Sequence, residues 1–142
     1  MAQIISDKNN GSRNGTLMGL VQVGWNVCPD EVTAAPTAAT LTQAQINKWN
    51  YFTIGNTSGA TDEFDLPALA NVGQSFAFFC EDTCEIRTTT ETDTINAVAS
   101  KGFTPLAGDL VLAVKVTATG WFLHKILASD GAVTSIVPGV AA

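Results

Sequence analysis

Charge is scarce in this chain of 142 residues, and basic charge is the scarcer kind. Only 14% of the residues are Asp, Glu, Lys or Arg, whereas about 25% is usual in soluble proteins. Seven basic residues stand against 13 acidic ones, and the net charge is −6. Nucleic-acid binding needs clustered Lys and Arg to neutralise phosphates, so no nucleic-acid partner is expected. The surface must be built largely from Thr, Asn, Ser and Ala, or be covered by partners.

Long apolar runs and a secretory leader are also missing. No window of about 18 apolar residues exists, so we predict no membrane-spanning helix and no membrane partner. The segment Met1–Lys8 has no basic stretch followed by an apolar run, which is not typical of a secretory signal. Three cysteines are too few for a disulfide-rich secreted scaffold, so synthesis in a reducing cytoplasm is the default expectation.

Residues typical of catalytic sites are few. His124 is the only histidine, and we interpret it as a core or interface residue. There is no nucleophile-elbow pattern, no phosphate-binding glycine motif and no spacing that demands two convergent carboxylates. A zinc site would require Cys28 and His124 to meet the other two cysteines by tertiary accident. We therefore predict no catalytic residues, no cofactor, no metal and no enzymatic activity.

Cys80 and Cys84 flank three residues, Glu81-Asp82-Thr83, that are typical of a short hairpin loop. Such a hairpin would place the two cysteines opposite each other on adjacent strands. Opposed strand residues have Cα atoms about 4.5–5.5 Å apart, which is compatible with a disulfide. Both states, a Cys80–Cys84 disulfide and two free thiols, remain open.

Acidic charge is concentrated in the middle of the chain. Eight of the 13 acidic residues lie between positions 51 and 100, where Arg87 is the only basic residue. A solvated face that keeps the protein soluble explains this pattern, and so does the outward face of an assembly. In either case we expect the loops around Asp62–Asp65 and Glu81–Glu85 to face solvent.

The N-terminal part of the chain predicts an arm. Leu17 to Val27 is an apolar stretch interrupted by two glycines and reads as one strand. Pro29 to Thr40 lacks bulky apolar residues and predicts an extended connector. Thr42 followed by Gln45 resembles a capping box, and the span Thr42–Trp49 is the only predicted helix. We divide the chain into an arm and connector with one strand (1–40), a body (41–128), and a C-terminal strand and tail (129–142).

From Tyr51 onward, apolar and polar residues alternate with the period of a β-strand. The predicted strands are Tyr51–Ile54, Glu63–Leu66, Ser75–Cys80, Glu85–Thr94, Leu110–Thr117, Trp121–Leu127 and Ala132–Val137. Gly120 marks a hairpin between the fifth and sixth of these. Short strands separated by turn residues predict an all-β fold, either an antiparallel β-sandwich or a jelly-roll-like domain with an extended N-terminal arm.

The strand Leu110–Val116 is apolar on both faces. We expect its even-numbered residues to fill the core, which leaves Val111 and Ala113 in need of another cover. A neighbouring copy of the chain is one candidate, and we assign Val111, Ala113 and Trp121 to such an interface. The alternative cover is a second sheet or connector from the same chain.

Four short motifs occur in a recognisable order between about residues 51 and 127. The motifs are Phe64-Asp65-Leu66-Pro67-Ala68, Val72-Gly73-Gln74-Ser75-Phe76, Asp93-Thr94-Ile95-Asn96 and Gly120-Trp121-Phe122. In this order they resemble the small β-sandwich module of tailed-phage virion proteins. The chain departs from that pattern at Asn96-Ala97, where the module often has glycine. Modules of this kind occur in fibres, spikes and capsid-decorating proteins, commonly as trimers, so the fold alone does not select the function.

The length and layout favour one member of that group. A fibre or tailspike needs a shaft and an attachment region, for which 142 residues leave no room. The resemblance therefore implies a phage capsid decoration (cement) protein, made in the host cytoplasm and placed on the virion surface. Its partners would be the major capsid protein and itself, as a homotrimer. The predicted capsid-binding arm comprises Ile4, Ile5, Arg13, Leu17, Met18 and Leu20.

The alternative is a head-fibre, tail-tip or receptor-binding module that grips host surface glycans. Sites of that kind use exposed aromatic rings with Asp or Asn partners. Four aromatic residues are candidates, although each is more typical of a core: Trp25, Trp49, Tyr51 and Trp121.

Overall fold

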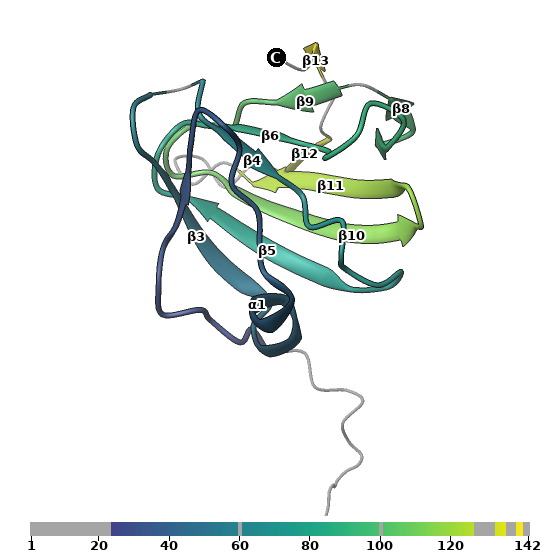
Figure 1. Cartoon of the computed structure of the whole chain (residues 1–142), viewed down its shortest axis with the longest axis horizontal. Coiled ribbons are helices and arrows are strands. Elements are labelled where there is room, and N and C mark those ends of the chain that lie inside the picture. The colour runs from purple at the N-terminus through teal and green to yellow at the C-terminus, as the bar shows by residue number, and fades with distance from the viewer. Residues whose placement is uncertain (1–23, 60, 100, 127–132, 136–138, 141–142) are drawn as a thin grey trace, which may run out of the picture.

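The computed structural model describes residues 24–59, 61–99, 101–126, 133–135 and 139–140, and these form two sheets and one short helix (Figure 1). The all-β prediction is therefore confirmed. The larger sheet has eight strands in the order β2-β3-β5-β10-β11-β7-β8, with β12 paired to β11 beside that path. The smaller sheet has the order β13-β9-β6-β4. Within the described ranges, no helix has the length and hydropathy needed to cross a membrane.

The strand bounds follow the predicted ones closely in the middle of the chain. The larger sheet consists of β2 (Val32–Ala34), β3 (Tyr51–Asn56), β5 (Ser75–Cys80), β7 (Thr94–Ile95), β8 (Val98–Ala99), β10 (Leu110–Thr117), β11 (Gly120–Ile126) and β12 (Val133–Ser135). The smaller sheet consists of β4 (Glu63–Asp65), β6 (Glu85–Arg87), β9 (Lys101–Phe103) and β13 (Gly139–Val140). The predicted strand Glu85–Thr94 is too long, because the chain leaves β6 after Arg87 and turns through residues 88–93 before β7 begins.

In the first half of the described chain the backbone follows a solenoid-like path, and from β3 to β6 successive strands lie alternately in the two sheets. Val32 of β2 pairs in parallel with Ile54 of β3, and Ile54 pairs in parallel with Cys80 of β5. Between these strands the chain crosses to the smaller sheet, where Phe64 of β4 pairs in parallel with Ile86 of β6. Parallel neighbours need such a crossover, because a tight hairpin joins only antiparallel strands. The prediction of a purely antiparallel arrangement is therefore wrong: both sheets are mixed.

The predicted connector is part of this path. β2 lies inside the segment Pro29–Thr40, and Ala34 is completely buried. After β2, Ala35 and Ala39 form isolated bridges with Glu63 and Phe64 at the edge of the smaller sheet. Interpreting this segment as a linker outside the body is thus wrong. Small residues suit it because the chain packs directly against its neighbours there.

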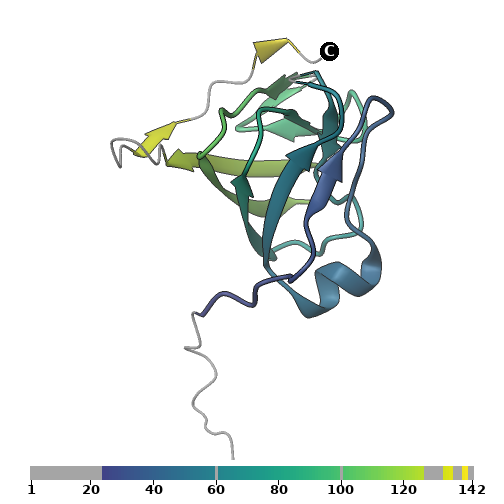
Figure 2. The same cartoon turned by 90° about the vertical axis from the view of Figure 1, so that its left-hand side faces the viewer.

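The single described helix, α1 (Gln43–Lys48), confirms the capping box. The Thr42 hydroxyl accepts a hydrogen bond from the backbone N–H of Gln45 (3.2 Å), and the Gln45 side chain accepts one from the N–H of Thr42 (2.8 Å). These two bonds satisfy donors that a helix start otherwise leaves unpaired. Ile46 is the buried residue of α1, which lies at one end of the body (Figure 2).

A cluster of phenylalanines forms the core between the sheets. Phe52, Phe76 and Phe78 of the larger sheet are almost fully buried, with ring centroids 6.0–6.3 Å apart. Phe64 of the smaller sheet is fully buried and meets Phe78 edge-on at 5.2 Å. Rings in such stacked, tilted and edge-on arrangements stabilise the fold by more than their buried area alone would provide. The two sheets therefore share one core.

The β10–β11 hairpin is confirmed, and it builds the centre of the larger sheet. Its register runs from Leu110 opposite Ile126 to Lys115 opposite Trp121, and the turn closes at Gly120. A side chain at position 120 would bring a Cβ to within 2.6 Å of the Thr117 hydroxyl oxygen, closer than real contacts allow. A larger residue at position 120 would therefore force the Thr117 side chain to move.

Candidate interaction surface

The outer side of the larger sheet, opposite the phenylalanine core, is apolar across its three central strands. On this side, Val114 lies between Phe122 and Ser75, Leu112 lies between His124 and Ala77, and Leu110 lies between Ile126 and Phe79. Val116 continues the line at the end of β10. We call this set the outer face: Ser75, Ala77, Phe79, Leu110, Leu112, Val114, Val116, Phe122, His124 and Ile126.

The outer face is uncovered at one end and carries no fixed charge. Phe122 is 45% exposed and Val116 is 49% exposed, while Leu110, Leu112 and Val114 are half-buried. None of its ten residues is Asp, Glu, Lys or Arg, because the charged residues of β10 and β11 alternate onto the other side of the sheet. A continuous apolar patch without charge is the usual character of a surface that another molecule covers.

This arrangement reverses the predicted faces of β10. Val111 and Ala113 are completely buried in the chain's own core, and Trp121 is 2% exposed. These three side chains therefore offer no surface to another copy, and their assignment to an interface is wrong. The even-numbered residues, predicted to fill the core, lie on the outer face instead. The chain's own core covers Val111 and Ala113, which confirms the alternative to a neighbouring copy.

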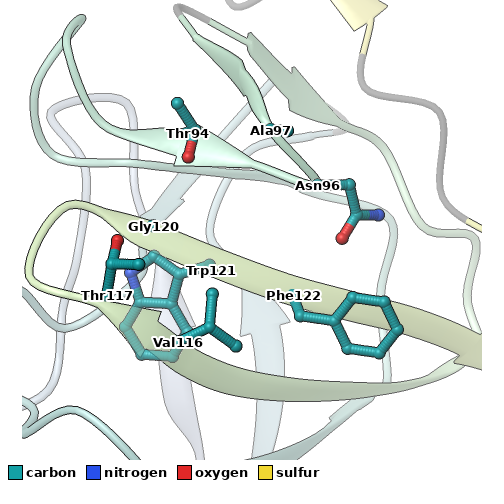
Figure 3. A pocket seen from close by; sticks show the side chains of 8 residues that line it. All are labelled: Thr94, Asn96, Ala97, Val116, Thr117, Gly120, Trp121 and Phe122. Atoms are coloured by element: carbon teal, nitrogen blue, oxygen red, sulfur yellow. The ribbon is translucent and has the colours of Figure 1, made fainter.

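A hollow of about 370 Å³ adjoins the exposed end of the outer face. Figure 3 shows how it is built: Thr94, Asn96 and Ala97 come from the β7–β8 hairpin, Gly120, Trp121 and Phe122 from β11, and Val116 and Thr117 from the end of β10. Apolar side chains, two hydroxyls and the amide of Asn96 line it, and no carboxylate or amine is among its eight described residues. The hollow therefore fits an apolar side chain better than a charged ligand.

The β7–β8 turn on one side of this hollow has an unusual backbone. Asn96 and Ala97 both have positive φ angles, 50° and 69°, which is the pattern of a two-residue hairpin turn. Asparagine tolerates that conformation, but alanine carries a Cβ that clashes with the following carbonyl. Ala97 is thus a strained position at the rim of the hollow.

His124 lies on the outer face. This position is consistent with its interpretation as a core or interface residue. Its ring centroid is 4.8 Å from that of Phe122, and the side chain is half-buried. In the part of the chain that the structure describes, no three His, Cys, Asp or Glu side chains come together as metal ligands. The only histidine of the chain thus forms part of an aromatic surface with Phe122.

The cysteines are free thiols, and the predicted Cys80–Cys84 hairpin is wrong. Cys80 ends β5 in the larger sheet, whereas Cys84 directly precedes β6 in the smaller one. Both side chains are completely buried and form a hydrogen bond with each other. That hydrogen bond, together with burial, raises the pKa of the Cys80 thiol far above its ordinary value. Both effects disfavour the thiolate form of Cys80, which is the reactive form of a cysteine.

The acidic loops are only partly exposed. Asp62 is 1% exposed and Glu85 is 6% exposed, so the expectation that both loops face solvent is wrong for these two residues. Asp62 folds inward because the hydroxyl and N–H groups of Thr57 and Ser58 donate hydrogen bonds to it. Glu81 and Asp82 remain exposed, beside Glu31 at the start of β2.

The predicted capsid-binding arm lies outside the described residues. Ile4, Ile5, Arg13, Leu17, Met18 and Leu20 all precede Gly24, where the described chain begins. Of the aromatic residues weighed as sugar platforms, Trp25 is 47% exposed, whereas Trp49 and Tyr51 are half-buried and Trp121 is buried.

Comparisons of this chain with family models, with curated proteins and with solved structures give no match. The surface must therefore be interpreted from its own chemistry.

Proposed function

We propose that this chain is a capsid decoration protein of a tailed phage, which binds the assembled major-capsid lattice as a homotrimer and stabilises it. We propose also that its two sheets form a β-sandwich of the kind that the four sequence motifs resemble. The single observation that carries the proposal is the outer face, which is apolar and uncharged although the chain already has a complete core. Such a face belongs to a protein that works in association with other copies or with a larger surface.

The occupant that we assign to the outer face is a second copy of this chain. The net charge of −6 opposes the approach of identical copies through their charged surfaces. The outer face is free of fixed charge, so it is the side on which copies meet with the least repulsion. Burying its apolar side chains would contribute about 25 cal/mol for each Å² removed from water.

Trimerisation makes capsid binding stronger than any single subunit contact. Three linked subunits bind one lattice with an avidity that exceeds the affinity of each contact, provided that all three reach their sites. Stabilisation of the shell follows if the trimer binds the assembled shell better than the expanded, unbridged one. In this arrangement the exposed acidic residues around Glu81 and Asp82 face solvent or the neighbouring trimer.

The association is tested on the purified full chain with Phe122→Asp, which places a charge on the outer face at an exposed position. We expect sedimentation equilibrium to give a trimer for the wild type and a monomer for the variant, with unchanged far-UV circular dichroism. Val72→Asp is the matched control, because Val72 is 59% exposed but lies outside the outer face. A wild-type chain that remains a monomer at high micromolar concentration contradicts the assignment.

The capsid role is tested in virions. Decoration predicts hundreds of copies per particle, whereas a fibre or tail part predicts a dozen or fewer. Particles that lack this protein should assemble normally but release DNA at a lower temperature or after osmotic shock. Particles of normal robustness that fail to adsorb to cells would favour the receptor-binding alternative and reject the cement function.

A further inference from the structure

Trp25 is the most exposed of the three tryptophans, and it packs against Tyr51, which pairs with Ala77 of β5. Its indole is 47% exposed and lies edge-on to Tyr51, with ring centroids 6.2 Å apart and planes at 66°. The backbone next to it is fixed as well, because Val27 bridges Tyr51 and the Cys28 N–H donates to the Tyr51 carbonyl at 2.9 Å. A half-exposed indole on a fixed backbone is a ready platform for a ligand with an apolar side.

A polar hollow of about 420 Å³ adjoins this indole and is lined by Gly24, Trp25, Asn26 and Asn50. Hydrogen bonds join the segment around Asn26 to the segment around Asn50. The Asn26 N–H donates to Asn50 Oδ1 at 2.6 Å, and Asn26 Nδ2 donates to the Lys48 carbonyl at 3.0 Å. The Asn50 N–H in turn donates to the Asn26 carbonyl at 2.9 Å. These contacts orient both side-chain amides before any ligand arrives.

Each of these two side-chain amides has one polar atom that can bind a ligand. Asn50 uses Oδ1, and Asn26 uses Nδ2, in the bonds described above. Among the described residues no hydrogen bond is formed by Asn50 Nδ2 or by Asn26 Oδ1. An oriented donor and an oriented acceptor therefore lie together beside an exposed aromatic ring.

We infer that Trp25, Asn26 and Asn50 form a binding site for a neutral pyranose sugar. One side of a pyranose ring presents C–H groups that pack against the negative face of an indole. Neighbouring hydroxyls on its edge both donate and accept, so one pair of them matches Asn50 Nδ2 and Asn26 Oδ1. The volume of the hollow lies within the range of about 300–1,000 Å³ that small-ligand sites occupy. No Asp or Glu is among the four described residues that line it, so these four supply no carboxylate to pair with a charged ligand.

This inference does not rest on the proposed function, because the sugar site and the outer face share no residue. A decoration protein with such a site would attach particles weakly to glycan-coated surfaces. A failed trimer test leaves the sugar site standing, and a failed sugar test leaves the trimer standing.

The test is saturation-transfer NMR and titration of the purified full chain with the methyl glycosides of glucose, galactose, mannose and N-acetylglucosamine. We expect at least one of them to bind with a millimolar Kd and to quench or shift tryptophan fluorescence. Trp25→Ala should weaken that binding at least tenfold. Asn50→Asp keeps the oxygen that accepts from Asn26 but replaces the free donor by an acceptor, so it should also weaken binding about tenfold.

Phe122→Ala is the matched control, because it removes another exposed aromatic ring, 45% exposed, from the outer face. It should leave sugar binding unchanged. The inference is overturned if none of the four glycosides binds, or if Trp25→Ala binds as tightly as the wild type. Equal losses in Trp25→Ala and Phe122→Ala would also overturn it, because they would show a general effect of surface aromatic rings.

Discussion

The side-chain amide of Asn96 takes the place of a backbone peptide group opposite Leu123. Asn96 Oδ1 accepts a hydrogen bond from the Leu123 N–H at 2.9 Å, and Asn96 Nδ2 donates one to the Leu123 carbonyl at 3.2 Å. The backbone of β7 pairs with β11 only as far as Ile95 opposite Trp121. The amide therefore adds one more rung to the parallel ladder at the point where the backbone turns away.

Replacing this rung should weaken the fold measurably. We expect Asn96→Ala to lower the free energy of unfolding by about 1–3 kcal/mol, because it leaves the N–H and C=O of Leu123 unpaired. Urea unfolding followed by circular dichroism measures the change. Asn96→Asp keeps the acceptor and loses the donor, so its loss should be about half as large. An Asn96→Ala variant as stable as the wild type would mean that water replaces both bonds at no cost.

The next residue predicts a change of opposite sign. Ala97 has φ = 69°, a conformation that costs an L-residue with a Cβ about 1–2 kcal/mol. Ala97→Gly should therefore raise the free energy of unfolding by about 0.5–1 kcal/mol, since glycine loses part of the gain as chain entropy. Ala99→Gly is the matched control, because Ala99 is an exposed strand residue without positive φ, and it should destabilise the chain. If both variants are destabilised alike, the turn at Ala97 is not strained.

Local signals in the sequence predicted the elements that depend on local chemistry. Thr42 and Gln45 form their capping box within one helical turn, and β5 has the predicted bounds Ser75–Cys80. Gly120 closes the predicted hairpin for the same reason. The parallel pairing of Ile54 with Cys80 could not be predicted in this way. It depends on where the chain returns after crossing to the other sheet, and no turn residue encodes that.

The prediction of which face of β10 fills the core was wrong, because both faces are apolar and the strand alone does not distinguish them. Leu110 and Leu112 are larger than Val111 and Ala113, yet the smaller pair faces the core. Ala113 lies opposite Phe76 and Val111 lies opposite Phe78, so the small residues leave room for the phenylalanine rings of β5. Which residues of β10 fit the core depends on the side chains of the neighbouring strand β5. Close packing constrains the combined volume of side chains that pack together, and does not constrain the size of each one separately. The cover that Val111 and Ala113 need comes from the same chain, which is the alternative that the sequence left open.

Asp62 should make the fold sensitive to strong acid. The hydroxyl of Thr57 is the first of four donors within 2.7–2.8 Å of its carboxylate, and together these donors hold the pKa of Asp62 well below its ordinary value. A carboxyl whose pKa is lowered by folding stabilises the fold above the unfolded pKa of about 3.9. That contribution is lost as the pH falls toward the folded pKa.

The measurement is the melting temperature of wild type and Asp62→Asn between pH 2 and pH 6. The variant should melt lower at pH 6, and the difference should shrink as the pH falls below about 4. Asp30→Asn, at an exposed position, is the control and should melt with the wild type throughout. Melting curves of wild type and Asp62→Asn that differ by the same amount at every pH would rule out the carboxylate as the cause.

Glu81 should act in the opposite direction. A hydrogen bond between its carboxyl group and that of Glu31, and then the negative charge of Glu31, raise the pKa of Glu81 above its ordinary value. A carboxyl whose pKa is raised by folding stabilises the fold fully below the unfolded pKa of about 4.3. This contribution disappears as the pH rises through the higher folded pKa, where two facing carboxylates repel each other.

Glu81→Gln keeps a donor toward Glu31 without the charge, so it should be more stable than the wild type at pH 7. Urea unfolding at intervals from pH 4 to pH 7 should show this advantage growing with pH. An advantage that is constant, or that shrinks toward neutral pH, would show that the two carboxyl groups do not share a proton in the folded chain.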